Sequence, residues 1–219
     1  LTAEVTAAGE RLSAQRRAAA DRFANAVGDE LAHLAMGSAR IQVAVTPRPL
    51  GPHGADDVEI QLAANSGAPA RSVGRAASGG ELSRLMLAIE VVSVSGSTPA
   101  ALVPTFVPTF VPTFVFDEVD AGVGGKAGLD VGARLAALAT HAQVVVVTHL
   151  AQVAAFADRH LVVHKSDDGS VTASAVREVE GDERLVLRMA ELGDVAPPDA
   201  LLAGTVTFPP ELVRITMKA

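Results

Sequence analysis

Apolar residues recur at helical spacing through the first 36 residues, and this pattern predicts one long helix. Gly37 is placed to end it. The part before about Ala20 has too few large apolar residues to fold alone, so it needs a partner. A coiled-coil arm entering a globular domain and an ordinary packed surface helix both fit. The apolar positions are Val5, Leu12, Phe23, Val27, Leu31 and Leu34.

Large apolar residues then alternate with smaller or polar ones in two short stretches, at Ile41, Val43 and Val45 and at Val58, Ile60 and Leu62. Alternation with period two is typical of half-buried strands, and we expect these two to pair in antiparallel fashion. Between them lies a segment rich in proline and glycine, which predicts a long connection. A second loop is expected from Ala63 to Ala77.

A second helix is predicted to begin at Ser78, because Ser78 and Glu81 have the spacing of a capping box. Gly79 and Gly80 fall in its first turn, where glycine weakens a helix but lets a ligand approach the backbone closely. Bare amides and a serine hydroxyl at a helix start suit a phosphate. The alternative is a capped helix whose glycines only relieve packing. One apolar face is expected, formed by Leu82, Leu85, Met86 and Ile89.

Three tandem copies of Pro-Thr-Phe-Val occupy residues 104–115. Proline every four residues cannot sit inside a central strand, so only the last copy can be one. We expect the first two copies to form an extended, partly exposed loop. The last copy predicts a buried strand, Thr113–Phe116, that runs directly into Asp117 and Glu118.

The two adjacent acids carry candidate chemistry. Ligands of open α/β sheets bind beyond the carboxyl ends of the strands. There, Asp117 could hold hydrated Mg²⁺, which prefers carboxylate oxygen, and Glu118 could activate a water molecule. A strand that ends in two solvated acids is the competing interpretation.

The next segment alternates helices and strands. A glycine-rich turn from Val119 to Lys126 leads into a predicted helix, and a second buried strand ends at Thr148-His149. That position would let His149 touch a phosphate oxygen, although a lone histidine is usually structural. The turn matches neither a Walker A loop nor a dinucleotide fingerprint in full. The remaining predicted elements are helix 127–139, strand 144–147, helix 151–157, a hairpin of strands 161–164 and 171–176, helix 182–192 and an irregular tail from 194.

Composition narrows the function classes. A 219-residue chain with 49% hydrophobic residues has room for a core and is not disordered. No uninterrupted apolar stretch reaches membrane-spanning length. The net charge of −7 argues against a broad DNA-binding face, and the absence of cysteine excludes disulfides and fits a reducing cytoplasm. The first residue is leucine, so we expect a fragment or a processed chain.

Taken together, the motifs resemble the second half of an ABC-type ATPase head. The resemblance rests on a signature motif (Ser78 to Glu81), a Walker B strand (Asp117, Glu118), a D-loop (Asp120 to Gly125) and a switch histidine (His149), in that order. Glutamate in the signature and the phrase Asp-Glu-Val-Asp-Ala-Gly-Val-Gly-Gly favour the SMC-like branch. Within it the chain is most similar to the RecN family of bacterial DNA double-strand-break repair ATPases.

This resemblance implies an α/β fold: the C-terminal lobe of a P-loop NTPase head, with a mainly parallel sheet core and antiparallel hairpins. It divides the chain into a coiled-coil helix (1–36), the lobe (37–193) and a tail (194–219). It further implies two heads that sandwich ATP and Mg²⁺. The partners would be an N-terminal Walker A lobe of the same protein, a second copy and DNA, the last through regions outside this fragment. A cytoplasmic, nucleoid-associated protein with no membrane contact is expected.

The resemblance also implies a role for each site residue. Ser78 and the amides of Gly79 and Gly80 would contact the γ-phosphate of nucleotide held by the opposite head, and Glu81 completes this nucleotide-binding motif. Asp117 would hold Mg²⁺, Glu118 would activate the hydrolytic water, His149 would contact the γ-phosphate and Asp120 would link the two sites across the dimer.

Three departures from the family pattern stand out. Walker A is missing, so this chain alone should bind ATP poorly or not at all. The repeat lies directly before Walker B and could shift the register of that strand. The tail does not look like the family. The alternatives are a transporter ATPase subunit and a catalytically silent interaction lobe.

Overall fold

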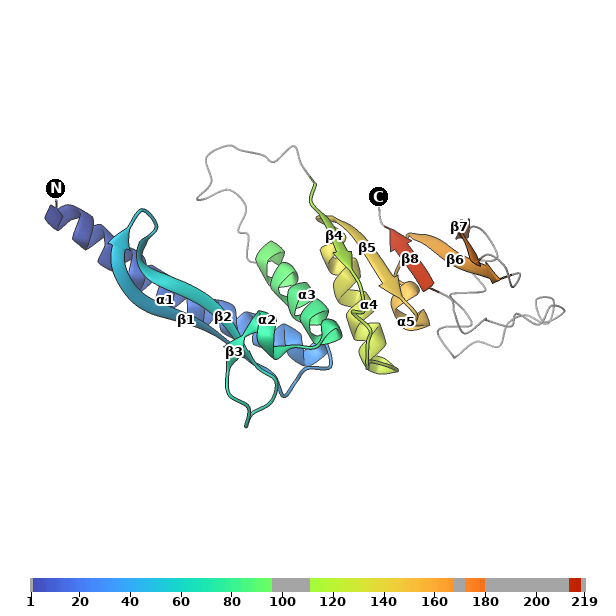
Figure 1. The fold of residues 1–219 in the computed structure, drawn as a ribbon, viewed down its shortest axis with the longest axis horizontal. Coiled ribbons are helices and arrows are strands. Elements are labelled where there is room, and N and C mark those ends of the chain that lie inside the picture. The colour runs from blue at the N-terminus through green and yellow to red at the C-terminus, as the bar shows by residue number, and fades with distance from the viewer. Residues whose placement is uncertain (1, 96–110, 168–171, 180–212, 218–219) are drawn as a thin grey trace. The chain divides into compact units, whose positions relative to one another are not determined.

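The computed structural model describes residues 2–95, 111–167, 172–179 and 213–217, which form two compact units divided at Val92/Ser93 (Figure 1). Each unit is described by itself. The predicted boundaries after residues 36 and 193 remain predictions. The elements are α1 (Thr2–His33), β1 (Arg40–Gly51), β2 (Gly54–Ala63), β3 (Arg71–Ser72), α2 (Val73–Ala76), α3 (Gly79–Ser95), β4 (Thr113–Phe116), α4 (Lys126–Leu138), β5 (Gln143–Thr148), α5 (Ala151–Ala154), β6 (Arg159–Asp167), β7 (Thr172–Val179) and β8 (Val213–Met217).

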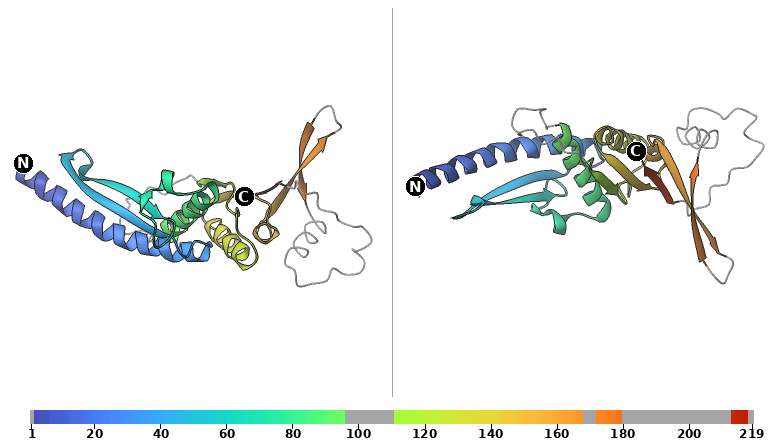
Figure 2. Two further views of the ribbon diagram at one scale, coloured as in Figure 1. Left: turned by 60° about the horizontal axis from the view of Figure 1, so that its bottom comes forward. Right: turned by 90° about the horizontal axis from the view of Figure 1, so that it is seen from above.

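In the first unit, α1 lies along the β1–β2 hairpin in both views of Figure 2. The C-terminal half of the helix carries the core, since Val27, Leu31 and Leu34 are fully buried. The earlier half is mostly exposed, as its sparse apolar pattern predicts. The helix does not end at Gly37. Ala35 takes the left-handed conformation, with φ of 58°, and ends it two residues earlier.

The connection between the first two strands is short, so the predicted long loop is wrong. β1 and β2 pair from Arg40↔Ala63 to Gly51↔Gly54, with a register shift between Pro47 and Gly51. Proline is tolerated here because β1 is an edge strand of the three-stranded sheet β1-β2-β3. Gly54 has φ of 93°, and a Cβ there would come within 2.8 Å of the Leu12 side chain on α1. The hairpin therefore turns tightly against the helix.

Helix α3 begins where the capping-box spacing predicts, but its apolar face differs from the prediction. Leu85, Leu87 and Ala88 are fully buried, whereas Leu82 and Met86 are exposed. Spacing fixes which residues share a face, but tertiary packing decides which face is covered.

The second unit is built on a five-stranded sheet in the order β4-β5-β8-β6-β7. β4 and β5 are parallel, with Phe116 opposite Val146, and the other pairs are antiparallel. Helix α4 buries Val131, Leu135 and Leu138, close to the helix that the sequence predicts. The mixed α/β class with a long N-terminal helix is therefore confirmed, and parallel pairing among the described strands is confined to β4 and β5.

Strand β8 is the main unexpected element of this unit. The sequence predicts an irregular tail from residue 194, yet Val213–Met217 pairs with both β5 and β6. The hairpin β6–β7 is also longer than predicted. The first two repeat copies, apart from Val111, and the predicted helix 182–192 lie outside the described residues.

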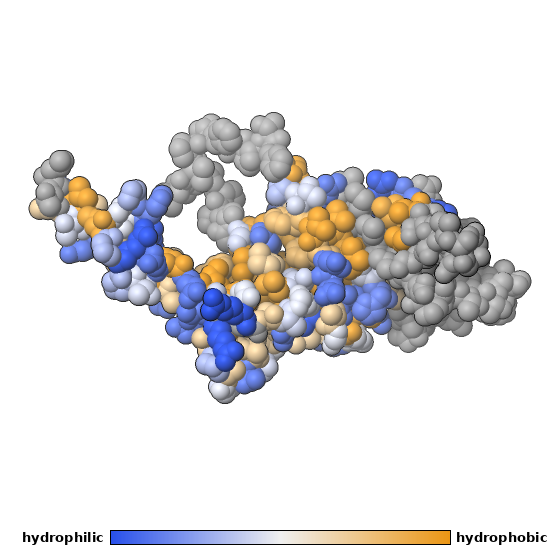
Figure 3. Space-filling model, viewed as in Figure 1, coloured by the Kyte–Doolittle hydropathy of each residue, from blue (hydrophilic) through white to orange (hydrophobic). Residues whose placement is uncertain are grey.

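Strand β4 has β5 as its one hydrogen-bonded neighbour among the described strands. Its Val115 is 68% exposed and Val111 just before it is 65% exposed. Figure 3 shows apolar surface over this part of the molecule. Within the described part of the chain, no helix is long and apolar enough to cross a membrane.

Candidate functional site

The two acids follow β4 as the sequence predicts. Phe116 is buried at the end of the strand, and Asp117 and Glu118 are exposed directly after it. Glu118 has φ of 55°, which is uncommon for a residue other than glycine. The amide of Ala121 donates to the Glu118 carbonyl at 3.0 Å, so the chain turns sharply at this acid. Backbone strain of this kind often accompanies functional sites.

Strand β5 brings His149 to the same edge of the sheet, because β4 and β5 run parallel and in register. An open cavity of about 350 Å³ lies there, lined by Asp117, Glu118, Asp120, Ala121, Val147, Thr148 and His149. All four site residues predicted after the repeat therefore meet around one cavity. The side chain of His149 is 67% exposed, so its ring is open to a ligand.

Asp120 is the most buried polar group of this site, at 2% exposure. Its Oδ2 accepts hydrogen bonds from the Thr148 hydroxyl, from the His149 amide at 3.0 Å and from the Leu150 amide at 3.1 Å. The Nδ1 atom of His149 lies 3.2 Å from the same oxygen, an ion-pair distance when the ring is protonated. The carboxylate thus faces inward, toward its own chain. The sequence pattern singles out Asp120 but not the role of Thr148.

The residues around the cavity suit a hydrated Mg²⁺ ion, which needs few protein ligands, better than a metal ion that is held by the protein alone. Among the described residues no group of three or more carboxylates or histidines is assembled for a metal ion. Mg²⁺ is usually held by one or two carboxylates, with waters and substrate phosphates completing its shell. Asp117 supplies one such carboxylate, exposed at the end of β4.

The predicted phosphate site at the start of α3 belongs to the first unit, and Asp117 and Glu118 belong to the second. The Ser78 amide donates to Glu81 Oε2 at 2.9 Å, and the Glu81 amide donates to Ser78 Oγ at 3.4 Å. This confirms the capping box. The hydrogen bonds from Ser78 hold the pKa of Glu81 below its usual range, so this carboxylate stays ionised. Ser78 and Gly79 are exposed, and Gly80 is buried.

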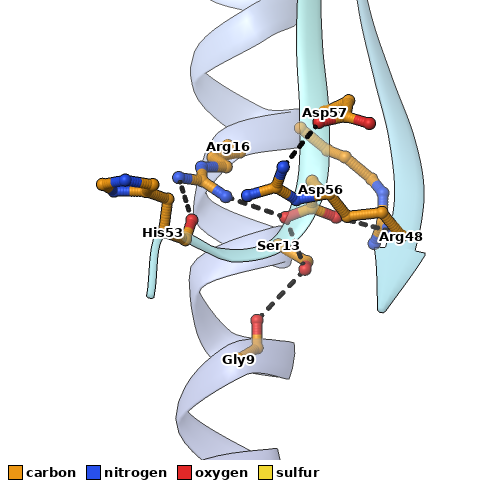
Figure 4. A network of polar contacts seen from close by, with 8 residues as sticks. Gly9, Ser13, Arg16, Arg48, His53, Asp56 and Asp57 are labelled. Carbon is orange, nitrogen blue, oxygen red and sulfur yellow. Dashed lines mark hydrogen bonds and ion pairs between the residues drawn. The ribbon is translucent and has the colours of Figure 1, made fainter. Parts of the chain in front are cut away.

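Sequence reasoning missed a second buried carboxylate, Asp56 on β2 (Figure 4). Its side chain is 1% exposed, accepts a hydrogen bond from Ser13 Oγ at 2.7 Å and lies 3.2 Å from Arg16 Nη1. Arg16 also donates to the His53 carbonyl at 2.8 Å. This network ties α1 to the hairpin. No local sequence pattern could have revealed this network, because Ser13 and Arg16 lie 43 and 40 residues before Asp56 in the chain.

Several curated DNA repair proteins resemble this chain in sequence. No family model matches it. The DNA repair protein RecN of Streptomyces coelicolor is 53% identical over 198 residues, which is 84% of this chain and 32% of that protein. RecN of Treponema pallidum is 38% identical over 221 residues, 98% of this chain and 36% of the relative. The chain is similar to about a third of RecN. The predicted resemblance to RecN is thereby confirmed.

RecN of Mycobacterium tuberculosis is 41% identical, and the match covers 89% of this chain and 35% of the relative. The chain thus spans about one third of the length of the curated RecN proteins it matches. Among solved structures, the Smc head domain of Pyrococcus yayanosii, with a coiled coil and joint, has a TM-score of 0.49 and 21% identity; the match covers 80% of this chain and 30% of that one.

Proposed function

We propose that this chain is part of a RecN-type ATPase that acts in the repair of DNA double-strand breaks. One observation carries the proposal: Asp117, Glu118 and His149 line a single cavity where two parallel strands end. Similarity to RecN over most of the chain supports the same function.

In this proposal the cavity hydrolyses ATP to ADP and phosphate. Glu118 accepts a proton from the attacking water as the new oxygen–phosphorus bond forms and the bond to the leaving ADP breaks. Asp117 holds Mg²⁺, which when bound neutralises charge on the phosphates. His149 contacts the γ-phosphate. Catalysis then comes from positioning and charge, with no covalent intermediate.

The complete site is proposed to need more than this chain. An N-terminal lobe of the same protein would supply the Walker A loop. A second copy would present its Ser78, Gly79, Gly80 and Glu81 to the nucleotide, through the start of the capped helix, which is exposed at Ser78 and Gly79. DNA would bind through regions outside this chain, in keeping with its net charge of −7, and the protein would work in the cytoplasm, at the nucleoid.

Glu118→Gln tests the proposal in a protein that joins this chain to its Walker A lobe. Gln keeps the size of the side chain but cannot accept the proton, so turnover should fall about 10²- to 10⁴-fold. ATP-bound dimers should accumulate, as seen by light scattering with ATP and Mg²⁺. Glu59→Gln, at an exposed position of β2, is the matched control and should leave turnover unchanged. Full turnover in the Glu118 variant would show that Glu118 is not the catalytic base.

A further inference from the structure

Among the described residues, the hydrogen bonds to the Asp120 carboxylate come from one short segment of the chain. The donors are the Thr148 hydroxyl and the amides of His149 and Leu150, and all three bonds reach the same oxygen, Oδ2. The Leu150 amide is shared, since it also donates to Thr148 Oγ1 at 3.0 Å. Hydrogen bonds to an ionised acceptor are about twice as strong as neutral ones. One buried carboxylate therefore holds the end of β5 and the residues that lead into α5.

This arrangement fixes the backbone of His149 while leaving its ring accessible. The histidine amide is bonded to Asp120, whereas 67% of the histidine side chain is exposed. The ring is restrained on one side only, by Nδ1 at 3.2 Å from Oδ2. A ring anchored at its backbone and open at the cavity is suited to contact a ligand with little loss of entropy on binding.

Asp120 is also tied closely to Glu118. Only Val119, which is fully buried, separates the two acids. The bond from the Ala121 amide to the Glu118 carbonyl and the bond of 3.1 Å from the Val123 amide to the Asp120 carbonyl make this stretch a tight double turn. Any movement of Asp120 must therefore move both the Glu118 backbone and the His149 segment.

We propose that Asp120 is a positioning residue that fixes His149 relative to Glu118 within one chain. Its carboxylate serves this internal link rather than a direct contact to a second copy, since it is 2% exposed and bonded inward. The catalytic consequence rests on the proposed function, but the link itself does not. Other groups of the glycine-rich turn remain available for contacts between copies.

Amide hydrogen exchange of the 219-residue chain tests the link directly. Asp120→Ala removes the acceptor, so the amides of His149 and Leu150 should exchange about tenfold faster or more. Asp120→Asn keeps an oxygen acceptor without charge and should give a smaller increase. Asp130→Asn on α4, whose partner Lys126 lies outside the cavity lining, is the control and should change neither amide. Unchanged exchange in both Asp120 variants would overturn the proposal, and the Asn variant decides if the Ala variant does not fold.

Turnover in the protein joined to its Walker A lobe tests how Asp120 acts. If it works through His149, Asp120→Asn should lower kcat with KM for ATP unchanged, and should cause no further loss in a His149→Ala background. An equal loss in both backgrounds would show an independent role and overturn the proposal. If His149→Ala itself keeps full turnover, the proposed role of His149 fails, and the exchange experiment alone decides whether the link exists.

Discussion

At the scale of single residues, the end of α1 depends on one alanine. Ala35 has φ of 58°, and the Met36 amide donates to the Leu31 carbonyl at 3.0 Å across it. This is the bond pattern of a Schellman motif, with buried Leu31 and Met36 at its two ends. Glycine usually fills the left-handed position, because a Cβ there costs about 1–2 kcal/mol. The helix therefore ends where packing requires it, against the preference of the residue.

Ala35→Gly should raise the free energy of unfolding by about 0.5–1 kcal/mol, since relief of the left-handed strain exceeds the added entropy of the unfolded chain. Ala18→Gly, at an exposed position inside the same helix, is the matched control and should lower it by about 1 kcal/mol. Urea denaturation followed by circular dichroism measures both. Equal destabilisation by the two variants would contradict the motif.

Asp56 shows how a buried carboxylate makes stability depend on pH. The hydrogen bond from Ser13, followed by the hydrogen bond and the positive charge of Arg16, holds its pKa below the ordinary value, against the opposing effect of burial. In the unfolded chain the pKa of an aspartate side chain is about 3.9. The stabilisation is therefore present above about pH 4 and is lost as the pH falls through the lower, folded value.

The difference in stability between the native chain and Asp56→Asn should accordingly be largest near neutral pH and shrink below about pH 4. The measurement is the urea midpoint of both proteins from pH 7 to pH 2.5. Asp57→Asn serves as control, because the Asp57 side chain is 69% exposed and should matter little at neutral pH. If the difference in urea midpoint between the native chain and Asp56→Asn stays constant down to pH 2.5, the ionised Asp56 carboxylate does not stabilise the fold.

At the scale of elements, the approach of α4 to α5 depends on two glycines one helical turn apart. A Cβ on Gly132 would come within 2.8 Å of Phe156 Cε2 and 3.1 Å of the Gln152 carbonyl. A Cβ on Gly128 would lie 3.3 Å from Gln152 Cβ. Because α5 begins two residues after His149, this contact also helps to fix the rim of the cavity.

Gly132→Ala should destabilise the second unit by about 1–3 kcal/mol, because the carbonyl of Gln152 cannot move aside as a side chain can. Gly28→Ala on α1 is the comparison, since nothing lies within 4 Å of the added Cβ. It should stabilise the protein by about 0.5–1 kcal/mol through helix propensity. Thermal unfolding of both variants shows whether each one stabilises or destabilises the protein. Stabilisation by Gly132→Ala would mean that α5 packs more loosely than described.

How far the elements could be predicted depends on the range of the interactions that define them. The start of α3 is set by Ser78 and Glu81, three residues apart, and the pattern reveals it. The buried face of α3 and the tight β1–β2 turn depend on distant partners, and there the predictions are wrong. Pro47 and Pro49 favour a loop when only neighbouring residues are considered. They are tolerated in β1 because it is an edge strand.

At the scale of the whole molecule, the same distinction holds for the candidate site. Asp117, Glu118, Asp120 and His149 could be predicted to meet, because parallel strands place their carboxyl ends at one edge of a sheet. The inward orientation of Asp120 could not, since its partners arrive from β5. Strand β8 could not either, because nothing in its five residues indicates which strands it would join.

Removal of residues 213–219 tests the part that β8 plays in the second unit. β8 pairs Met217 with Val145 and Arg214 with Thr148 on one side, and Ile215 with Leu161 on the other. Without it, β5 keeps only β4 and β6 keeps only β7 among the described strands. Backbone amides in 145–148 and 159–163 should then exchange faster.

Residues 41–45 of the first unit provide the internal control in the same exchange experiment, because they pair with β2 and not with this sheet. Their protection should not change. If the amides of β5 and β6 keep their protection after the truncation, β8 does not hold the sheet together. If they lose it, the loosened strand β5 is the one that leads directly into His149, and the tail then supports the cavity through the sheet.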